Sequence, residues 1–249
     1  MTTEVCLTVD VEDWYDGMAV LGEQIARPDG ALSGLSGLTS LLASAGDKSI
    51  VTLFVVGHYA ATVLPELADL VAGGHEIASH GPDHGRLPED PVTLVEWLRR
   101  GRAMVEDLVQ VPVRGFRSPR FDIPQALGLA LYRELLAEAG FDYVSDTSRL
   151  GQGSPVRELP VLRRHRYPIG GGSYQRLLPT AALSVALGST TGPAVLYYHS
   201  YDFGATLPST GSIRSLAMAK QLLGRGRIAG LFSQNLNRYG SKACGHVEW

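Results

Sequence analysis

Carboxylate and histidine side chains, which can bind metals and transfer protons, stand at the ends of apolar runs in this chain. The first run, VCLTVDV, contains Asp10 near its end and is followed by three further carboxylates, at Glu12, Asp13 and Asp16. Carboxylates at the carboxyl end of a strand in an α/β fold lie where active sites form. A solvated turn or a helix N-cap is the alternative, and this segment alone does not decide between the two.

Two histidines, His80 and His84, stand four residues apart in the segment HGPDH. On one face of a helical turn, both imidazoles can reach the same cation. Pro82 disfavours a regular helix here, although a tight loop can bring the two rings together as well. A coincidence on the surface is the alternative. Two histidines with one carboxylate, and open positions for water, make a hydrolytic metal site.

Two further segments contain groups suited to catalysis. In FRSPRF, Arg117 can hold a carboxylate bidentately, and Pro119 stiffens the backbone so that neighbouring N–H groups can bind a ligand. His199 follows the apolar run VLYY. Each alone has a structural explanation, as a surface ion pair or a hydrogen-bonded core histidine. The chain has no G-x-S-x-G motif and neither cysteine has a plausible histidine setting, which disfavours a serine or cysteine nucleophile.

Short β-rich runs alternate with helical segments, and this pattern predicts a mostly parallel sheet covered by helices. The expected strands cover residues 5–11, 50–56, 75–79, 141–144 and 195–198. Helices are expected over residues 62–72 and 93–109, and another from Pro124 to Gly140. The run GGG at 170–172 predicts a loop whose backbone turns tightly or is closely approached. No repeat or linker interrupts the chain, so one domain over residues 1–249 is expected.

The composition limits the classes of function. A net charge of −3 with no basic field argues against binding to nucleic acid or anionic lipid. The N-terminus lacks the pattern of a signal peptide, and no apolar run approaches the length of a membrane span, so we expect a cytoplasmic protein without a transmembrane segment. Cys6 is expected to be a small buried hydrophobe, and a disulfide with Cys244 stays open.

In this order, the segments resemble the five motifs of the NodB-homology polysaccharide deacetylases, also called carbohydrate esterase family 4. LTVDVEDW is similar to the first motif, HEIASHGPDH to the second, FRSPRF to the third, YVSDTS to the fourth and VLYYHSYD to the fifth. DVEDW, ELPVLRRHRYPIGGGSYQRLLP and YYHSYDF are similar to the deacetylases associated with exosortase-linked exopolysaccharide systems. The resemblance covers about residues 4–205, with residues 206–249 as a helical or irregular C-terminal closure. It implies an α/β fold, a distorted (β/α)7-type barrel.

The resemblance implies a metal-dependent hydrolase that removes an N-acetyl group from an acetamido sugar. It implies a divalent cation, zinc above all, with cobalt, nickel or manganese as alternatives. The implied ligands are His80, His84 and Asp13, with Glu12 as the alternative carboxylate, because D-V-E-D stands where relatives have two adjacent aspartates. Strand alternation places Glu12 on the side of Asp10, whereas Asp13 is the commoner residue type for this role.

The resemblance also implies the catalytic roles. Asp10 is the implied base, steered by Arg117, and His199 is the implied acid that protonates the leaving amine. A backbone N–H near Arg120 is expected to bind the oxyanion. Asp146, in the fourth motif, is expected to orient or tune His199. The expected substrate-binding residues are Pro119, Arg120, Tyr197, Asp146, Gly172 and Tyr174.

The expected partner is an acetylated amino sugar, which is free or attached to a nucleotide, a lipid or a small metabolite. Tyr197 stands where many relatives have a leucine in the acetyl pocket, which implies a more polar pocket. Two other functions stay open: hydrolysis of another amide or acetyl ester on the same fold, and sugar binding without turnover. The oligomeric state is not indicated.

Overall fold

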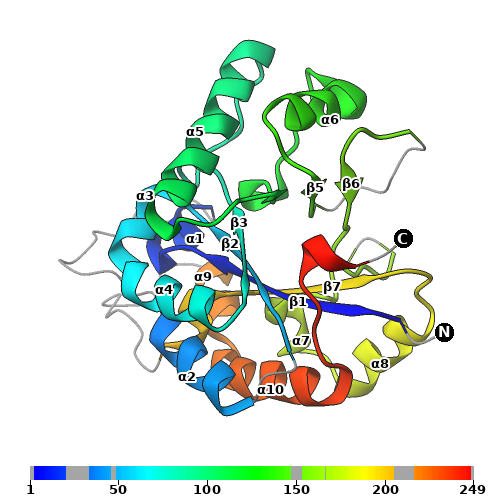
Figure 1. Ribbon diagram of the computed structural model, residues 1–249. Coiled ribbons are helices and arrows are strands. Elements are labelled where there is room, and N and C mark those ends of the chain that lie inside the picture. The colour runs from blue at the N-terminus through cyan, green and yellow to red at the C-terminus, as the bar shows by residue number, and fades with distance from the viewer. Residues whose placement is uncertain are drawn as a thin grey trace.

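A single seven-stranded sheet forms the centre of the computed structural model, which describes residues 3–20, 34–45, 49–146, 153–165, 167–204 and 216–247 (Figure 1). The strand order is β6-β5-β4-β3-β2-β1-β7, and every pair is parallel. The strands are β1 (Val5–Val11), β2 (Thr52–Val55), β3 (Glu76–Ser79), β4 (Gly115–Phe116), β5 (Tyr143–Val144), β6 (Arg157–Glu158) and β7 (Ala194–His199).

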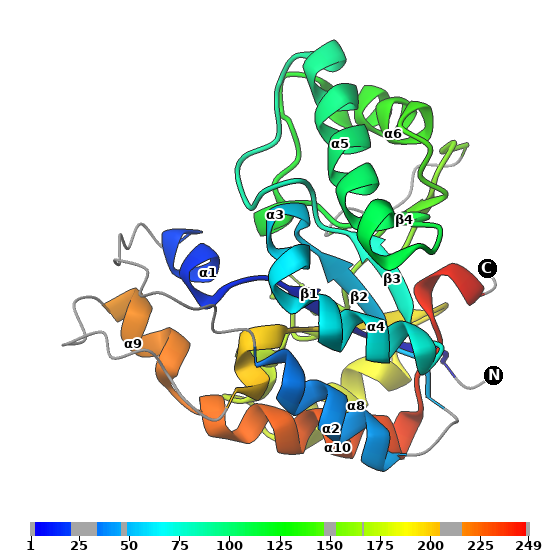
Figure 2. The same ribbon diagram turned by 60° about the vertical axis from the view of Figure 1, so that its left-hand side comes forward.

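Helices surround the sheet, and α2 and α10 lie side by side outside it (Figures 1 and 2). The α-helices are α1 (Trp14–Val20), α2 (Leu35–Ala45), α3 (Gly57–Ala60), α4 (Leu64–Ala72), α5 (Pro91–Val109), α6 (Gly128–Glu138), α7 (Gly172–Gln175), α8 (Thr180–Gly188), α9 (Leu216–Leu222) and α10 (Ile228–Tyr239). Short 3-10 turns are η1 (Ala61–Val63), η2 (Pro119–Phe121), η3 (Ser200–Phe203), η4 (Arg225–Arg227) and η5 (Cys244–His246). None of the helices in the described ranges is both long and apolar enough to cross a membrane.

The segment after β6 joins the two edges of the sheet. The N–H of Val161 donates to the carbonyl of Asp146, after β5, at 3.0 Å. On its other side Val161 pairs with Val195 of β7, and the N–H of Leu162 donates to the Val195 carbonyl at 2.9 Å. The sheet therefore curls around an interior, and the expected α/β barrel of the (β/α)7 type is confirmed.

Strand β1 is buried along its whole length because both faces of the sheet are covered. Its outward side chains, such as Leu7 and Val9, belong to the large core beneath the helices. Cys6 belongs instead to a second apolar cluster inside the barrel, with Phe54 and Tyr197 among its members. Since strand side chains alternate, Asp10 shares the inward face with Cys6 and lies at the open end of this interior.

The C-terminal turn η5 packs against the amino ends of the strands. The N–H of Cys244 donates to Thr52 Oγ1 at 2.9 Å, and the N–H of Gly245 donates to Glu76 Oε2 at 3.1 Å. Cys6 and Cys244 are both buried as free thiols in the inner cluster. The open question of a disulfide is thus answered for this structure. Residues 206–215 of the expected C-terminal closure lie outside the described residues.

One expected helix begins later than the sequence pattern indicates. Helix α6 begins at Gly128 instead of Pro124. Gly128 has a φ of 70°, outside the range of an α-helix, and this separates the preceding turn from the helix. The helix ends before Gly140, whose φ is 86°, as expected. Helix α5 begins two residues earlier than expected because Asp90 caps it by accepting from the Thr93 N–H at 2.9 Å.

Candidate active site

The carboxyl ends of neighbouring parallel strands bring the chemically active residues to one end of the sheet. Asp10 of β1 is in register with His199 of β7. His80 directly follows β3, two strands from β1, and Arg117 directly follows β4. The four side chains therefore come from segments far apart in sequence that end at the same edge.

Glu12, His80 and His84 form the group in the described part of the chain that can hold a metal ion. One ligand atom from each of the three lies within 4.8 Å of the others. Glu12 Oε2 is 2.5 Å from His84 Nε2 and 3.8 Å from His80 Nε2. This buried oxygen has no hydrogen bond of normal geometry. A divalent cation would satisfy it, and two imidazoles with one carboxylate are a donor set that zinc accepts.

The backbone fixes the orientation of His80. Its Nδ1 lies 2.9 Å from the carbonyl oxygen of Arg117. A carbonyl can only accept a hydrogen bond, so Nδ1 carries the proton and the lone pair of Nε2 faces Glu12. His84 is brought back by a loop and not by a helical turn, because Gly81 has a φ of 83° and Trp97 packs against it. The loop alternative for this histidine pair is thus the one observed.

The structure brings Glu12, and not Asp13, to the two histidines. Asp13 instead lies at the start of α1, where its carboxylate accepts from the Tyr15 N–H at 3.0 Å. Glu12 continues the alternation of β1 and so faces the same side as Asp10, the side that the histidines share. Glu12, the alternative carboxylate expected from the sequence, is thus the one that lies beside the histidines, and the preferred Asp13 is not. His58, to which the sequence assigns no role, lies nearby, 3.4 Å from Asp16.

Arg117 is completely buried and holds Asp10. Its Nη1 donates to Asp10 Oδ1 at 2.5 Å and to Thr8 Oγ1 at 2.9 Å. Its Nε and Nη2 donate to the carbonyl and the hydroxyl of Ser145, and its guanidinium lies 4.0 Å from the centre of the Phe54 ring. Burial acts to raise the pKa of Asp10, but the Arg117 charge and two histidines outweigh it and hold that pKa below its ordinary value. Asp10 is therefore ionised at neutral pH.

His199 lies on the other side of this site. Its Nε2 is 4.0 Å from Glu12 Oε1, and its Nδ1 is 3.5 Å from Asp202 Oδ2. Its ring stacks on Tyr201 with centroids 5.0 Å apart and planes 3° apart. Burial acts to lower the pKa of His199, but Asp202 and Glu12 outweigh it and raise this pKa to about 9. The imidazole is thus protonated at neutral pH, as a general acid requires.

Asp202 was missed by the sequence analysis, which expected Asp146 beside His199. The carboxylate of Asp146 accepts from the N–H of Ser118 at 3.0 Å and from the hydroxyl of Tyr132 at 3.1 Å. It therefore supports the segment that carries Arg117. The signal for Asp202 was its position three residues after His199, because a 3-10 turn brings residues i and i+3 together.

The expected substrate-binding residues divide into two groups. Pro119 is buried and Arg120 is exposed with a φ of 63°, so the Arg117 loop turns sharply at the site. The Tyr197 ring lies between Phe121 and His199, with centroid distances of 5.0 and 5.8 Å. The Tyr197 ring also lies 5.8 Å from the guanidinium of Arg117, which holds Asp10.

The glycine run serves packing against β7. A Cβ on Gly171 would lie 2.6 Å from the ring of Tyr197, and a Cβ on Gly172 would lie 2.8 Å from the ring of Tyr198. The close approach of the backbone expected for this run is observed, and Gly172 packs against the buried Tyr198. Tyr174, in α7, is partly exposed.

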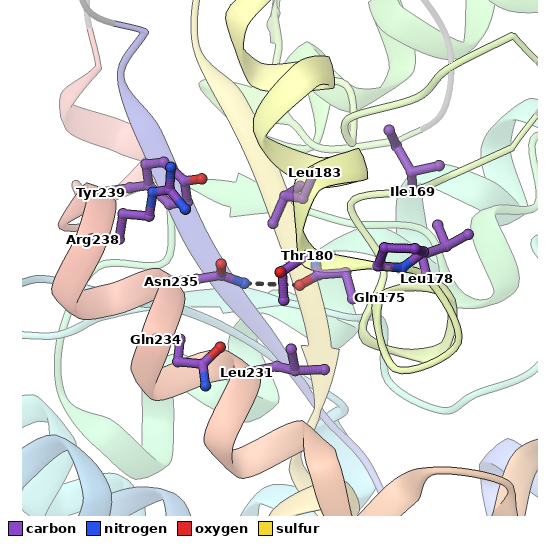
Figure 3. Close-up of a pocket in the computed structure, with 11 residues that line it drawn as sticks. Ile169, Gln175, Leu178, Thr180, Leu183, Leu231, Gln234, Asn235, Arg238 and Tyr239 are labelled. Carbon is purple, nitrogen blue, oxygen red and sulfur yellow. Dashed lines mark hydrogen bonds between the residues drawn. The ribbon is translucent and has the colours of Figure 1, made fainter.

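A separate pocket lies between α7, α8 and α10 (Figure 3). Its polar floor is a closed network in which Asn235 Nδ2 donates to Gln175 Oε1 and to Tyr198 Oη, both at 2.8 Å. Tyr198 points to the opposite side of β7 from His199, since the two are adjacent in the strand. None of Glu12, His80 and His84 (the metal-type cluster) lines this pocket, so the candidate active site remains the one at the carboxyl ends of the strands.

Two family models match the chain, one described as "Polysaccharide deacetylase" over residues 40–144 and one as "Domain of unknown function (DUF3473)" over residues 139–247. No curated protein matches the sequence. Among solved structures, a protein assigned as a polysaccharide deacetylase from Mycobacterium smegmatis is 20% identical, with a TM-score of 0.61 and coverage of 97% of this chain and 92% of that one. At such low identity this likeness shows the fold alone.

Two other solved structures share the fold. A family 4 carbohydrate esterase from Streptomyces lividans, in complex with acetate, is 18% identical, with a TM-score of 0.51 and coverage of 97% of this chain and 91% of that one. A pseudoenzyme of the same family from Bacillus anthracis is 11% identical, with a TM-score of 0.55 and coverage of 99% of this chain and 65% of that one. Over residues 40–144 the chain thus matches the polysaccharide deacetylase family, and the solved structures show that it shares their fold.

Proposed function

We propose that this protein removes the acetyl group from the nitrogen of an acetamido sugar by metal-dependent hydrolysis. The observation that carries the proposal is the meeting of a buried Asp10–Arg117 pair, the Glu12–His80–His84 cluster and His199 at one end of the sheet. Each of these groups has a structural explanation alone. Together they supply a base, a cation site and an acid, the three functions that amide hydrolysis needs.

Glu12, His80 and His84 would hold the cation. When bound, a divalent cation lowers the pKa of water and polarises the acetyl carbonyl. The two imidazoles favour zinc, with cobalt, nickel and manganese as alternatives. The orientation of His80 by the Arg117 carbonyl keeps its Nε2 available as a ligand.

Asp10 is the proposed base that takes a proton from the attacking water. Arg117 keeps the Asp10 carboxylate ionised and fixes its direction through their short contact of 2.5 Å. The first N–H groups of a helical turn have no partner inside the turn, so the N–H of Arg120 in η2 is the proposed donor to the oxyanion.

His199 is the proposed acid. An amide nitrogen leaves slowly unless it is protonated, and the protonated imidazole of His199 can supply that proton from Nε2, the ring nitrogen that faces Glu12. We propose that Tyr197 and Arg120 contact the acetamido group and the sugar. We propose the same role for Tyr174, which is partly exposed in α7.

The test is a screen for acetate release by the purified protein, supplied in turn with zinc, cobalt, nickel and manganese. The panel contains free, nucleotide-linked and lipid-linked acetamido sugars, acetylated glycosylated metabolites, a cyclic amide and an acetyl ester. Asp10→Asn should lower turnover by about 10²- to 10⁴-fold, the usual contribution of a positioned base. Asp107→Asn, on the exposed face of α5, is the matched control and should keep wild-type turnover.

Full turnover by the Asp10→Asn variant would show that the base is assigned wrongly. Turnover of the cyclic amide or the ester, with inert acetamido sugars, would favour a different hydrolase on this fold. Binding of acetylated sugars without acetate release, with every metal, would favour a sugar-binding protein, as the pseudoenzyme among the structural neighbours illustrates for the fold.

A further inference from the structure

A row of buried charged side chains leads from His199 away from the metal-type cluster. His199 Nδ1 lies 3.5 Å from Asp202 Oδ2, and Asp202 Oδ1 lies 3.7 Å from Arg225 Nε. The side chains of Asp202 and Arg225 are 2% and 10% exposed. Arg225 belongs to η4, in the C-terminal part of the chain that matches the domain of unknown function.

No other group in the described ranges hydrogen-bonds His199 Nδ1, Asp202 Oδ2 or Arg225 Nε. A buried polar atom without a partner costs free energy, so these three groups are held facing one another. A carboxylate beside Nδ1 fixes the proton on that nitrogen. The proton that His199 can give away is then the one on Nε2, the nitrogen directed at Glu12.

Arg225 also fixes the peptide that carries Asp202. Its Nη2 donates to the carbonyl of Tyr201, while its Nε faces the carboxylate of Asp202. Tyr201 stacks on the imidazole of His199. One guanidinium therefore holds two of the residues that contact His199, Tyr201 by its backbone and Asp202 by its charge.

Helix α9, just before η4, lies at the end of the molecule where β1 leads into α1 (Figures 1 and 2). Its Gln221 accepts from Arg176 Nη2 at 3.2 Å, and Arg227 in η4 donates to the Arg176 carbonyl at 2.6 Å. These contacts anchor the turn that carries Arg225 to the segment after α7.

From this geometry we infer that Arg225 is a positioning residue, through which the C-terminal segment aims the acid His199 at the leaving amine. The inference rests on the proposed function. In the step concerned, the C–N bond of the tetrahedral adduct breaks as Nε2–H of His199 protonates the nitrogen, so an amine and acetate leave and His199 becomes neutral. Arg225 touches neither the substrate nor the reacting atoms.

The test compares an acetamido sugar with p-nitrophenyl acetate, in the full chain loaded with zinc. An amide nitrogen needs a proton to leave, whereas p-nitrophenolate is a stable anion that leaves without one. Arg225→Gln should lower kcat for the amide by about tenfold to a hundredfold. Its KM for the amide, and its kcat for the ester, should stay within about twofold of the wild type.

Arg238→Gln is the matched control, since Arg238 is an exposed arginine of α10 in the same C-terminal part of the chain, with its guanidinium over Tyr239. It should behave as the wild type toward both substrates. Asp202→Asn is a second variant, and it should reproduce the loss that is selective for the amide. This variant keeps the test decisive if Arg225→Gln does not fold.

Three results would overturn the inference: unchanged amide turnover, equal losses on the amide and the ester, or the same selective loss in Arg238→Gln. Equal losses would mean that Arg225 only stabilises the fold. Failure of the proposed function looks different, because the wild type itself would then release no acetate from any acetamido sugar, and the inference would fall with it.

Discussion

Asp146 has a buried carboxylate whose ionisation destabilises the folded state. Burial outweighs its hydrogen bonds from Ser118 and Tyr132 and raises its pKa from 3.8 to about 6. Asparagine has almost the same shape. Its amide oxygen can accept from the Ser118 N–H, and its amide nitrogen can donate to the hydroxyl oxygen of Tyr132. Asp146→Asn therefore removes the ionisation and keeps both hydrogen bonds.

The sign follows from the higher pKa in the folded state. Below pH 3.8 the carboxyl is neutral in both states, and it costs nothing. Between this pH and about 6 the unfolded chain has released the proton while the folded chain keeps it, so stability falls as the pH rises. Each unit of pKa corresponds to about 1.4 kcal/mol, and the wild type should lose about 3 kcal/mol of unfolding free energy over this window.

Asp146→Asn should thus gain stability relative to the wild type as the pH rises. The gain should approach about 3 kcal/mol at pH 7 and vanish near pH 4. Urea denaturation of both proteins at several pH values, with a chelator present, measures this difference. The other titrating groups cancel in it.

Asp107→Asn, on the exposed face of α5, is the control and should show no such dependence. A difference between Asp146→Asn and the wild type that does not change between pH 4 and 7 would refute the reasoning. So would a variant that becomes relatively less stable as the pH rises.

Two further predictions concern the Glu12–His80–His84 cluster and the packing of Gly171 against Tyr197. Glu12→Gln should weaken zinc binding by about 10-fold or more, while Asp13→Asn should leave it within about twofold. Competition with a chromogenic chelator measures both affinities. The opposite ranking would return the metal carboxylate to Asp13. Gly171→Ala should lower the unfolding free energy by about 1–3 kcal/mol, because its Cβ would lie 2.6 Å from the Tyr197 ring. Gly230→Ala, a helical position with open space, should instead stabilise, and equal urea midpoints for the two variants would contradict this.

The fold could largely be predicted because its main strands have a recognisable pattern of apolar residues in the sequence. Strand β1 is buried on both faces and therefore reads as an apolar run, and its limits agree with the prediction. The boundary of α6 was wrong because a left-handed glycine, Gly128, interrupts the turn that contains Pro124. A backbone angle of this kind has no clear signature in the order of residue types.

The sequence by itself determined the types of the candidate groups at Asp10, His80, His84 and His199, and their place at the ends of strands. Only the tertiary structure places Glu12, and not Asp13, beside the two histidines, because the exit of the chain from β1 turns Asp13 toward α1. The same holds for the neighbours of the acid, since Asp202 and Arg225 meet through the packing of separate segments. Residue types and spacing encode chemistry along the chain, but contacts between distant segments depend on how the whole sheet curls.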